Sequence, residues 1–152
     1  MTTIRYCRSR GFDRPEETLA EADALARRQY YRVHVDGGRV DRAEQIHEGA
    51  VVRVVYVRDH AADDALRAAH RAGYGAVAFD VESSVRIEGA HRTQIRRTYD
   101  GQGQPRRFAE TTTDARGNVV REVLGITGPE SIIEYEHNEN HVLLRSTHNF
   151  RE

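Results

Sequence analysis

Lysine and tryptophan are absent from this chain of 152 residues, and cysteine and methionine occur once each. A single cysteine, Cys7, excludes an internal disulfide framework and fits a reducing compartment. Without lysine, all 23 basic residues are arginine. We attribute this usage to the base composition of the genome, although every guanidinium is also a planar fork that can bind an anion.

Long apolar runs are also missing. No run approaches the length of a transmembrane helix, and the first ten residues, MTTIRYCRSR, lack the apolar region of a signal peptide. The sequence therefore predicts a cytoplasmic protein with no membrane association. The formal net charge is only -1, and acids and bases are mixed along the chain, so no basic stripe indicates a nucleic-acid partner.

The size and composition fit a single domain over residues 1–152. A chain of 17.3 kDa can bury a core without disulfide or metal staples. Its hydrophobic fraction of 38% and charged fraction of 31% suit an open sheet with much exposed surface.

The order of helix and strand signals predicts the fold class. Asp13, Pro15 and Glu16 form a start like a capping box for a helix over about 14–28. Three strand patterns follow as hairpins over about 30–57. Asp59 is then placed to cap a helix over about 60–72 that ends at Gly73.

Residues from about 75 to 150 continue as strands, which predicts a C-terminal antiparallel meander. We therefore expect an α+β protein: a large, mostly antiparallel β-meander, curled into a half-barrel or cone, with two α-helices packed on one face. The number of strands and the closure of the sheet stay open.

The spacing Asp-x-x-Gly occurs twice in the second half of the chain, at Asp100/Gly103 and Asp114/Gly117. In a three-residue hairpin the Asp carboxylate binds backbone N–H groups and a left-handed Gly closes the turn. Each unit therefore predicts a hairpin turn, with Asp100 paired to Gln104 and Asp114 to Asn118. A calcium loop would need further oxygen ligands at alternate positions, which both stretches lack.

The same stretch resembles a known repeat. Tyr99-Asp100-x-x-Gly103, followed by Thr113-Asp114-x-x-Gly117-Asn118-Val119, is similar to the YD-repeat pattern of Rhs-type proteins and to related hairpin repeats of small bacterial antitoxin-like families. The resemblance covers residues 96–124. It implies a non-enzymatic sheet that serves as a shell or binding surface, and it carries no catalytic residue to this chain.

The register that follows from the two turns gives candidate site residues. Glu110 should face Glu122, and a buried pair of like charges would raise the pKa of one carboxyl, as a general acid or base requires. Alternatively, Arg96 or Arg106 bridges the two acids near solvent.

By the same register Arg97 should face Arg107. Two adjacent guanidinium groups need an anion, which could come from a partner protein or a small acidic ligand. A neighbouring strand carrying Glu134 and Glu136 could also supply it.

The last hairpin adds a histidine and a candidate metal site. A loop over 137–140 would pair Glu136 with His141 and place His148 on an apolar face with Tyr135, Ile133, Val142, Leu144 and Phe150. His148 is then either a core residue or a pocket base. His137, His141 and Glu136 could hold a metal at the hairpin tip, or they are ordinary polar turn residues. Since no metal, phosphate or nucleophile motif occurs elsewhere, the sequence predicts no cofactor.

Two functions remain after these exclusions. The first is a non-enzymatic protein-interaction module, for instance a toxin-neutralising or accessory protein, which binds a partner or itself through a charged sheet face. The second is a small-molecule-binding protein or acid/base enzyme whose pocket lies between curled sheet and helices. That pocket would be lined by Tyr99, Phe108, Tyr135 and His148, with a carboxylate inside. The absence of a catalytic motif favours the first.

Overall fold

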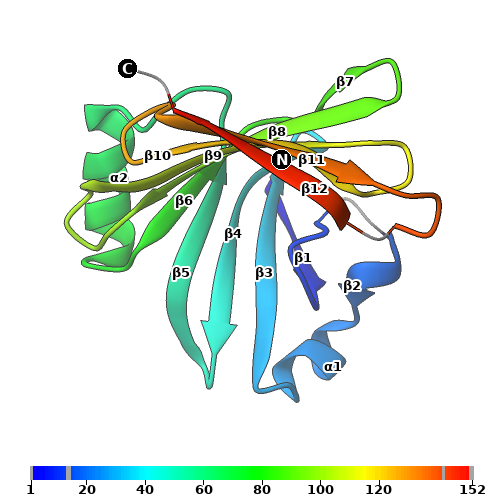
Figure 1. Ribbon diagram of the computed structural model, residues 1–152. Helices are drawn as coiled ribbons and strands as arrows, with labels where there is room; N and C mark the ends of the chain where they lie inside the picture. Colours follow the sequence, from blue (N-terminus) through cyan, green and yellow to red (C-terminus); the bar gives the residue numbers. More distant parts are fainter. Residues whose placement is uncertain (1, 13–14, 142, 151–152) are drawn as a thin grey trace.

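The computed structural model describes residues 2–12, 15–141 and 143–150 (Figure 1). Its elements, in chain order, are β1 (Thr2–Cys7), the 3-10 helix η1 (Pro15–Glu17), β2 (Thr18–Leu19), α1 (Glu21–Leu25), β3 (Gln29–Asp36), β4 (Arg39–His47), β5 (Ala50–Val57), α2 (Asp64–Tyr74), β6 (Phe79–Glu82), β7 (Arg86–Glu88), β8 (His91–Tyr99), β9 (Pro105–Thr113), β10 (Val119–Gly125), β11 (Ser131–His137) and β12 (Leu143–Phe150).

All twelve strands belong to one open sheet with the order β12-β11-β10-β9-β8-β6-β5-β4-β3-β1-β2, and β7 pairs with β8 beside this path. Every pairing is antiparallel except that of β5 with β6, which is parallel because α2 carries the chain back between them. Figure 1 shows a strongly twisted sheet, in which β3, β4 and β5 occupy the lower part of the view and β8 to β12 lie across the top. The predicted α+β fold with a large, mostly antiparallel sheet is confirmed, and the sheet does not close.

The first predicted helix is wrong in its extent. Residues 15–17 form a single 3-10 turn, and Thr18–Leu19 then pair as a short strand with β1, where Leu19 lies opposite Tyr6. The α-helix begins only at Glu21 and has five residues. The reason is the N-terminal strand β1, which was not predicted from the sequence and which pairs with residues 18–19. Asp13, the predicted cap, lies outside the described residues.

The second helix is correct in kind but starts and ends later than predicted. Asp63 is its N-cap, with a carboxylate that accepts a hydrogen bond from Leu66 N at 2.8 Å. Asp59 instead accepts a hydrogen bond from Ser84 N, in the segment between β6 and β7. The helix ends at Gly75, which has φ 69°, and Gly73 is an ordinary helical residue before it. Among the described residues, no helix has the length and apolar character needed to cross a membrane.

The two sides of the sheet carry different cores. On the side that we call the helix face, Tyr56, Phe79 and Tyr99 pack with Ala62 and Leu66 of the α2 segment. Ala24 of α1 packs on Tyr30 and Ile46, which the register places on this same face.

The opposite side, which we call the pocket face, carries Val33 and Val55. It is covered at one end by the segment after β1, whose Phe12 packs edge-on against Tyr31 at a centroid distance of 5.4 Å. The guanidinium of Arg5 donates to the Phe12 carbonyl and anchors this segment.

Both Asp-x-x-Gly units are hairpin turns, as predicted. The Oδ1 atom of Asp100 accepts from Gln102 N and Gln104 N, and that of Asp114 accepts from Arg116 N and Asn118 N, at 2.9–3.0 Å. Gly103 and Gly117 have φ values of 79° and 82°, which explains why glycine closes each turn. Each hairpin then carries a bulge just beyond its turn, between Thr98 and Tyr99 in the first and between Val119 and Arg121 in the second.

Candidate anion-binding site

The bulge in the first hairpin separates the predicted arginine pair. Arg97 lies opposite Phe108, and its guanidinium stands 5.4 Å from the ring centroid on the helix face. Arg107 lies opposite Thr98 on the pocket face. The prediction that Arg97 faces Arg107 is therefore wrong, because one extra residue in a strand turns every following side chain to the other side.

The bulge in the second hairpin has the same effect on the predicted carboxylate pair. Glu110 lies opposite Val123, and Glu122 lies opposite Thr111, so the two acids stand on opposite faces. Glu122 instead accepts a hydrogen bond of 2.7 Å from the hydroxyl of Tyr135. The predicted acid/base pair of Glu110 and Glu122 is not formed.

The aromatic residues of the predicted pocket are also divided between the faces. Tyr99 and Phe108 are buried on the helix face, where Tyr99 stacks on Phe79 and its hydroxyl accepts from Ala62 N. Tyr135 stands on the pocket face by register. His148 pairs with Ile133 through the backbone, but its side chain lies outside the described part of the chain.

The candidate metal ligands do not come together at one point. Glu136 forms an ion pair with Arg145 at 3.0 Å, and Nδ1 of His141 lies 2.9 Å from Oδ1 of Asn118. The strand register puts Arg145, rather than His141, opposite Glu136, and His137 opposite Leu143. Within the described ranges, no group of three or more His, Cys, Asp or Glu side chains could hold a metal ion.

The structure instead brings polar residues from five segments together on the pocket face. A hollow of about 410 Å³ opens between the N-terminal segment, β5, β6, β8 and β9. Its lining residues alternate along their strands and therefore project to the same side: Arg10, Arg53, Asp80, Gln94, Arg96, Thr98, Arg107, Ala109 and Thr111.

Two buried carboxylates bind the arginines of this hollow: Asp80 belongs to its lining, and Glu82 lies two residues further along the same strand. Asp80 and Glu82 stand on the central strand β6 and are only 2% and 6% exposed, although both carry an ionisable carboxyl group. Arg10 binds both, with N–O distances of 2.5 Å to Asp80 and 2.7 Å to Glu82. Arg53 adds a contact of 2.8 Å to the second oxygen of Asp80, and Arg96 adds one of 2.8 Å to Glu82. The charges of both buried acids are therefore balanced by arginine side chains of the same chain, as buried charges require.

The fourth arginine of the hollow is not neutralised in this way. Arg107 has no ion pair or hydrogen bond from its side chain to any residue in the described ranges. Arg10, Arg53, Arg96 and Arg107 together bring four positive charges, against two negative charges on Asp80 and Glu82. The hollow thus has an excess of positive charge. The guanidinium N–H groups of Arg107 also lack a hydrogen-bond acceptor among the described residues.

Sequence reasoning identified Arg107 and missed most of this set. Arg96 was expected only as a bridge between Glu110 and Glu122, but it pairs with Glu82, and Arg106 pairs with Asp100. A signal was present in the strand patterns: FDVE carries acids at positions 80 and 82, which alternate with apolar residues, and VVRVVYV carries one arginine among apolar residues. An acid at a position that should face a core needs a basic partner. The partner Arg10 is 70 residues away in sequence, so no local pattern could indicate it.

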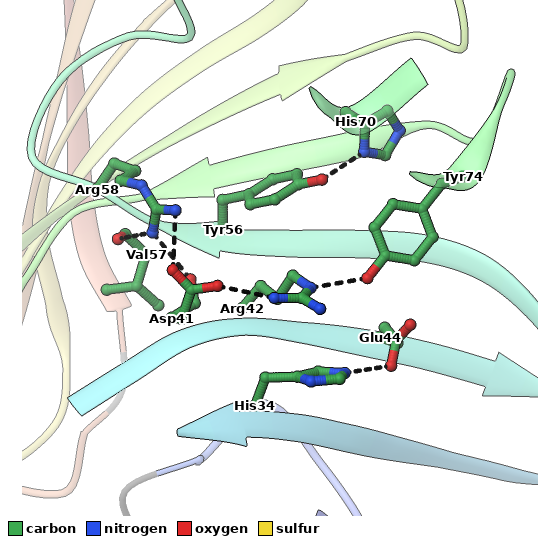
Figure 2. A network of polar contacts seen from close by, with 9 residues as sticks. All are labelled: His34, Asp41, Arg42, Glu44, Tyr56, Val57, Arg58, His70 and Tyr74. Atoms are coloured by element: carbon green, nitrogen blue, oxygen red, sulfur yellow. Dashed lines mark hydrogen bonds and ion pairs between the residues drawn. The ribbon is translucent and has the colours of Figure 1, made fainter. Parts of the chain in front are cut away.

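A second polar network lies on the helix face (Figure 2). The buried carboxylate of Glu44 accepts from Arg32 at 2.7 Å and lies 2.6 Å from Nε2 of His34. Burial opposes ionisation of Glu44, but the hydrogen bonds of Arg32, His34 and Tyr74 outweigh it and hold the pKa at about 2. Arg42 donates to the Tyr74 hydroxyl at 2.8 Å and extends the network toward α2.

Tyr56 and His70 form a hydrogen-bonded pair on the same face. The Nε2 atom of His70 donates to the Val77 carbonyl at 2.6 Å, so its Nδ1 accepts the hydroxyl of Tyr56 at 2.7 Å. Burial lowers the pKa of His70 and raises that of Tyr56, so both stay neutral near pH 7. Each polar side chain of this network has a partner, which indicates a structural role in holding α2 on the sheet.

The functional candidate is therefore the hollow with the excess of arginine. Comparisons of the chain with protein-family models, curated proteins and solved structures give no match.

Proposed function

We propose that this protein binds an anionic group of a ligand, a carboxylate or a phosphate, in the arginine-lined hollow of the pocket face. The observation that supports the proposal is Arg107, which lacks an acidic partner among the described residues and lies beside three further arginines. Arginine binds carboxylate and phosphate in bidentate geometry, and such charge-assisted bonds are the strongest that side chains form.

The surroundings of Arg107 favour a ligand over an internal partner. Asp80 and Glu82 are already occupied by Arg10, Arg53 and Arg96, so neither is free to neutralise Arg107. Thr98 lies directly opposite Arg107 in the sheet, and Gln94 and Thr111 line the same hollow. These neutral groups can donate to the remaining oxygens of an anion without adding charge.

Binding without catalysis is the form of this function that the site supports best. A general acid or base has to reach the ligand with a free carboxyl, imidazole or thiol. In the described lining of the hollow the one acid is Asp80, and both of its oxygens accept from arginine. The proposal therefore keeps the non-enzymatic character that the YD-repeat resemblance implies, and it assigns the binding to the charged sheet face.

Calorimetric titration with phosphate, citrate and succinate tests this proposal. Arg107→Gln should weaken the binding of the best of these anions by about tenfold or more, since a charge-assisted hydrogen bond contributes about 1.5–3 kcal/mol. Arg106→Gln is the matched control, because it makes the same charge change one residue away, where Arg106 pairs with Asp100 outside the hollow. Equal affinities for the two variants, or no binding to the unmodified protein, would disprove the proposal.

A further inference from the structure

The arginine-lined hollow does not end at the centre of the sheet. A second hollow of about 380 Å³ continues along the same β8–β9 hairpin and shares Gln94 and Thr111 with the first. At its far end lie Arg92 and Thr113, which face each other across the two strands. The two hollows therefore form one groove along the hairpin, and we call it the β8–β9 groove.

The floor of the β8–β9 groove has a regular chemistry. Every second residue of each strand points into it, which gives Thr98, Arg96, Gln94 and Arg92 on β8 and Arg107, Ala109, Thr111 and Thr113 on β9. An arginine without an acidic partner among the described residues thus stands at each end, Arg107 and Arg92, and the pairs Arg96–Ala109 and Gln94–Thr111 lie between them. Hydroxyl and amide groups both donate and accept hydrogen bonds, as the carbonyl and N–H groups of a peptide require.

The two ends of the groove are too far apart for one compact anion. Thr98, opposite Arg107, and Arg92 are six positions apart on β8, which corresponds to about 20 Å of extended strand. Like Arg107, Arg92 makes no ion pair or hydrogen bond from its side chain to another described residue. Asp114 also lines this end, but its Oδ1 atom is engaged by the amides of Arg116 and Asn118 in the turn.

We infer that the natural ligand is an extended acidic peptide segment of a partner protein, which lies along the β8–β9 groove with acidic side chains at both ends. This inference rests on the proposed anion binding at Arg107. It adds the length of the ligand and a second anion contact at Arg92. An extended segment of about six residues spans the distance between the two arginines. Its backbone can hydrogen-bond to Gln94 and Thr111 in the middle of the groove, and its two acids neutralise Arg107 and Arg92.

A pair of synthetic peptides tests the length and the second anchor. Both have about six residues, with glycine and serine in the middle; one carries glutamate at both ends and the other at a single end. In fluorescence anisotropy at low salt, we expect the two-ended peptide to bind about tenfold tighter, because a second charge-assisted contact contributes about 1.5–3 kcal/mol. Arg92→Gln should remove this difference and leave the one-ended peptide unaffected.

The outcomes separate this inference from the proposed function. Arg107→Gln should weaken both peptides, and Arg106→Gln should weaken neither. Equal binding of the two peptides, with no effect of Arg92→Gln, would overturn the inference, while the binding of phosphate or citrate would still support the proposed function. Failure of every anion and both peptides to bind would overturn both. Because Arg92 is exposed, its variant is expected to unfold at the same urea concentration as the unmodified protein.

Discussion

Replacement of Glu44 by glutamine tests the polar network of the helix face in a quantitative way. The substitution keeps the shape of the side chain and removes the charge that binds Arg32 and His34. The hydrogen bonds of Arg32, His34 and Tyr74 outweigh burial and lower the pKa of Glu44 from 4.5 to about 2, which corresponds to about 3 kcal/mol of folding free energy.

The sign of this contribution sets its pH dependence. The pKa of Glu44 is lower in the folded protein than in the unfolded chain, so the carboxylate stabilises the fold fully above about pH 4.5. That stabilisation is lost as the pH falls toward about 2, where Glu44 becomes protonated in both states. Glu44→Gln should therefore be about 3 kcal/mol less stable than the unmodified protein at pH 7, and the two should converge below pH 3.

Urea denaturation followed by circular dichroism at pH 7, 4.5 and 3 measures this difference. Glu48→Gln is the control, because Glu48 forms an exposed ion pair with Arg28 and should change stability by less than about 1 kcal/mol at any pH. A difference between Glu44→Gln and the unmodified protein that stayed constant from pH 7 to 3 would refute the assigned contacts of the Glu44 carboxylate. So would a loss as small as that of the control.

Two further substitutions test the N-terminal segment and the turn beside α2. Arg10→Ala leaves Asp80 and Glu82 with one arginine each and should lower the free energy of unfolding by about 2–4 kcal/mol in urea denaturation, whereas Arg8→Ala, at an exposed position, should change it by less than about 1 kcal/mol. Gly101→Ala places a Cβ atom 2.2 Å from the Ala76 carbonyl oxygen and should lower the thermal midpoint by several degrees, or about 2 kcal/mol. Gly73→Ala, inside α2, places a Cβ atom that meets no other atom within 4 Å and should raise the free energy of unfolding by about 0.5–1 kcal/mol. Similar effects of the two glycine substitutions would show that the turn does not contact the segment after α2.

The fold class could be predicted because its signals are local. Strand periodicity and the Asp-x-x-Gly turns depend on residues close together in the chain, and they identified β3 to β5 and β8 to β12. The N-terminal strand was missed although TTIRYC is rich in strand-forming residues, since its pairing with β3 is made across more than 20 residues. The parallel pairing of β5 with β6 could have been expected from strand, helix and strand in succession.

The site could be predicted only in part because it depends on two features that leave little trace in a sequence. A bulge adds one residue to a strand and exchanges its faces, so turn geometry alone paired Arg97 with Arg107 and Glu110 with Glu122. The contact of Arg10 with β6 depends on the path of the N-terminal segment over the sheet. The expected charged sheet face did not require either feature, because the abundance of arginine and acidic residues in the strands is visible in the sequence.

The strand order described above also has a consequence for how the chain folds. From β3 to β12 the neighbours in the sheet are, with the exception of β7, neighbours in the sequence. Most pairings therefore close short loops at a small cost in chain entropy, which favours fast folding because few contacts join residues distant in sequence. The main long-range step is the docking of Arg10 and Phe12 on strands that are already paired. The N-terminal segment should thus be the last part to become ordered, and the arginine-lined hollow should be completed only when it docks.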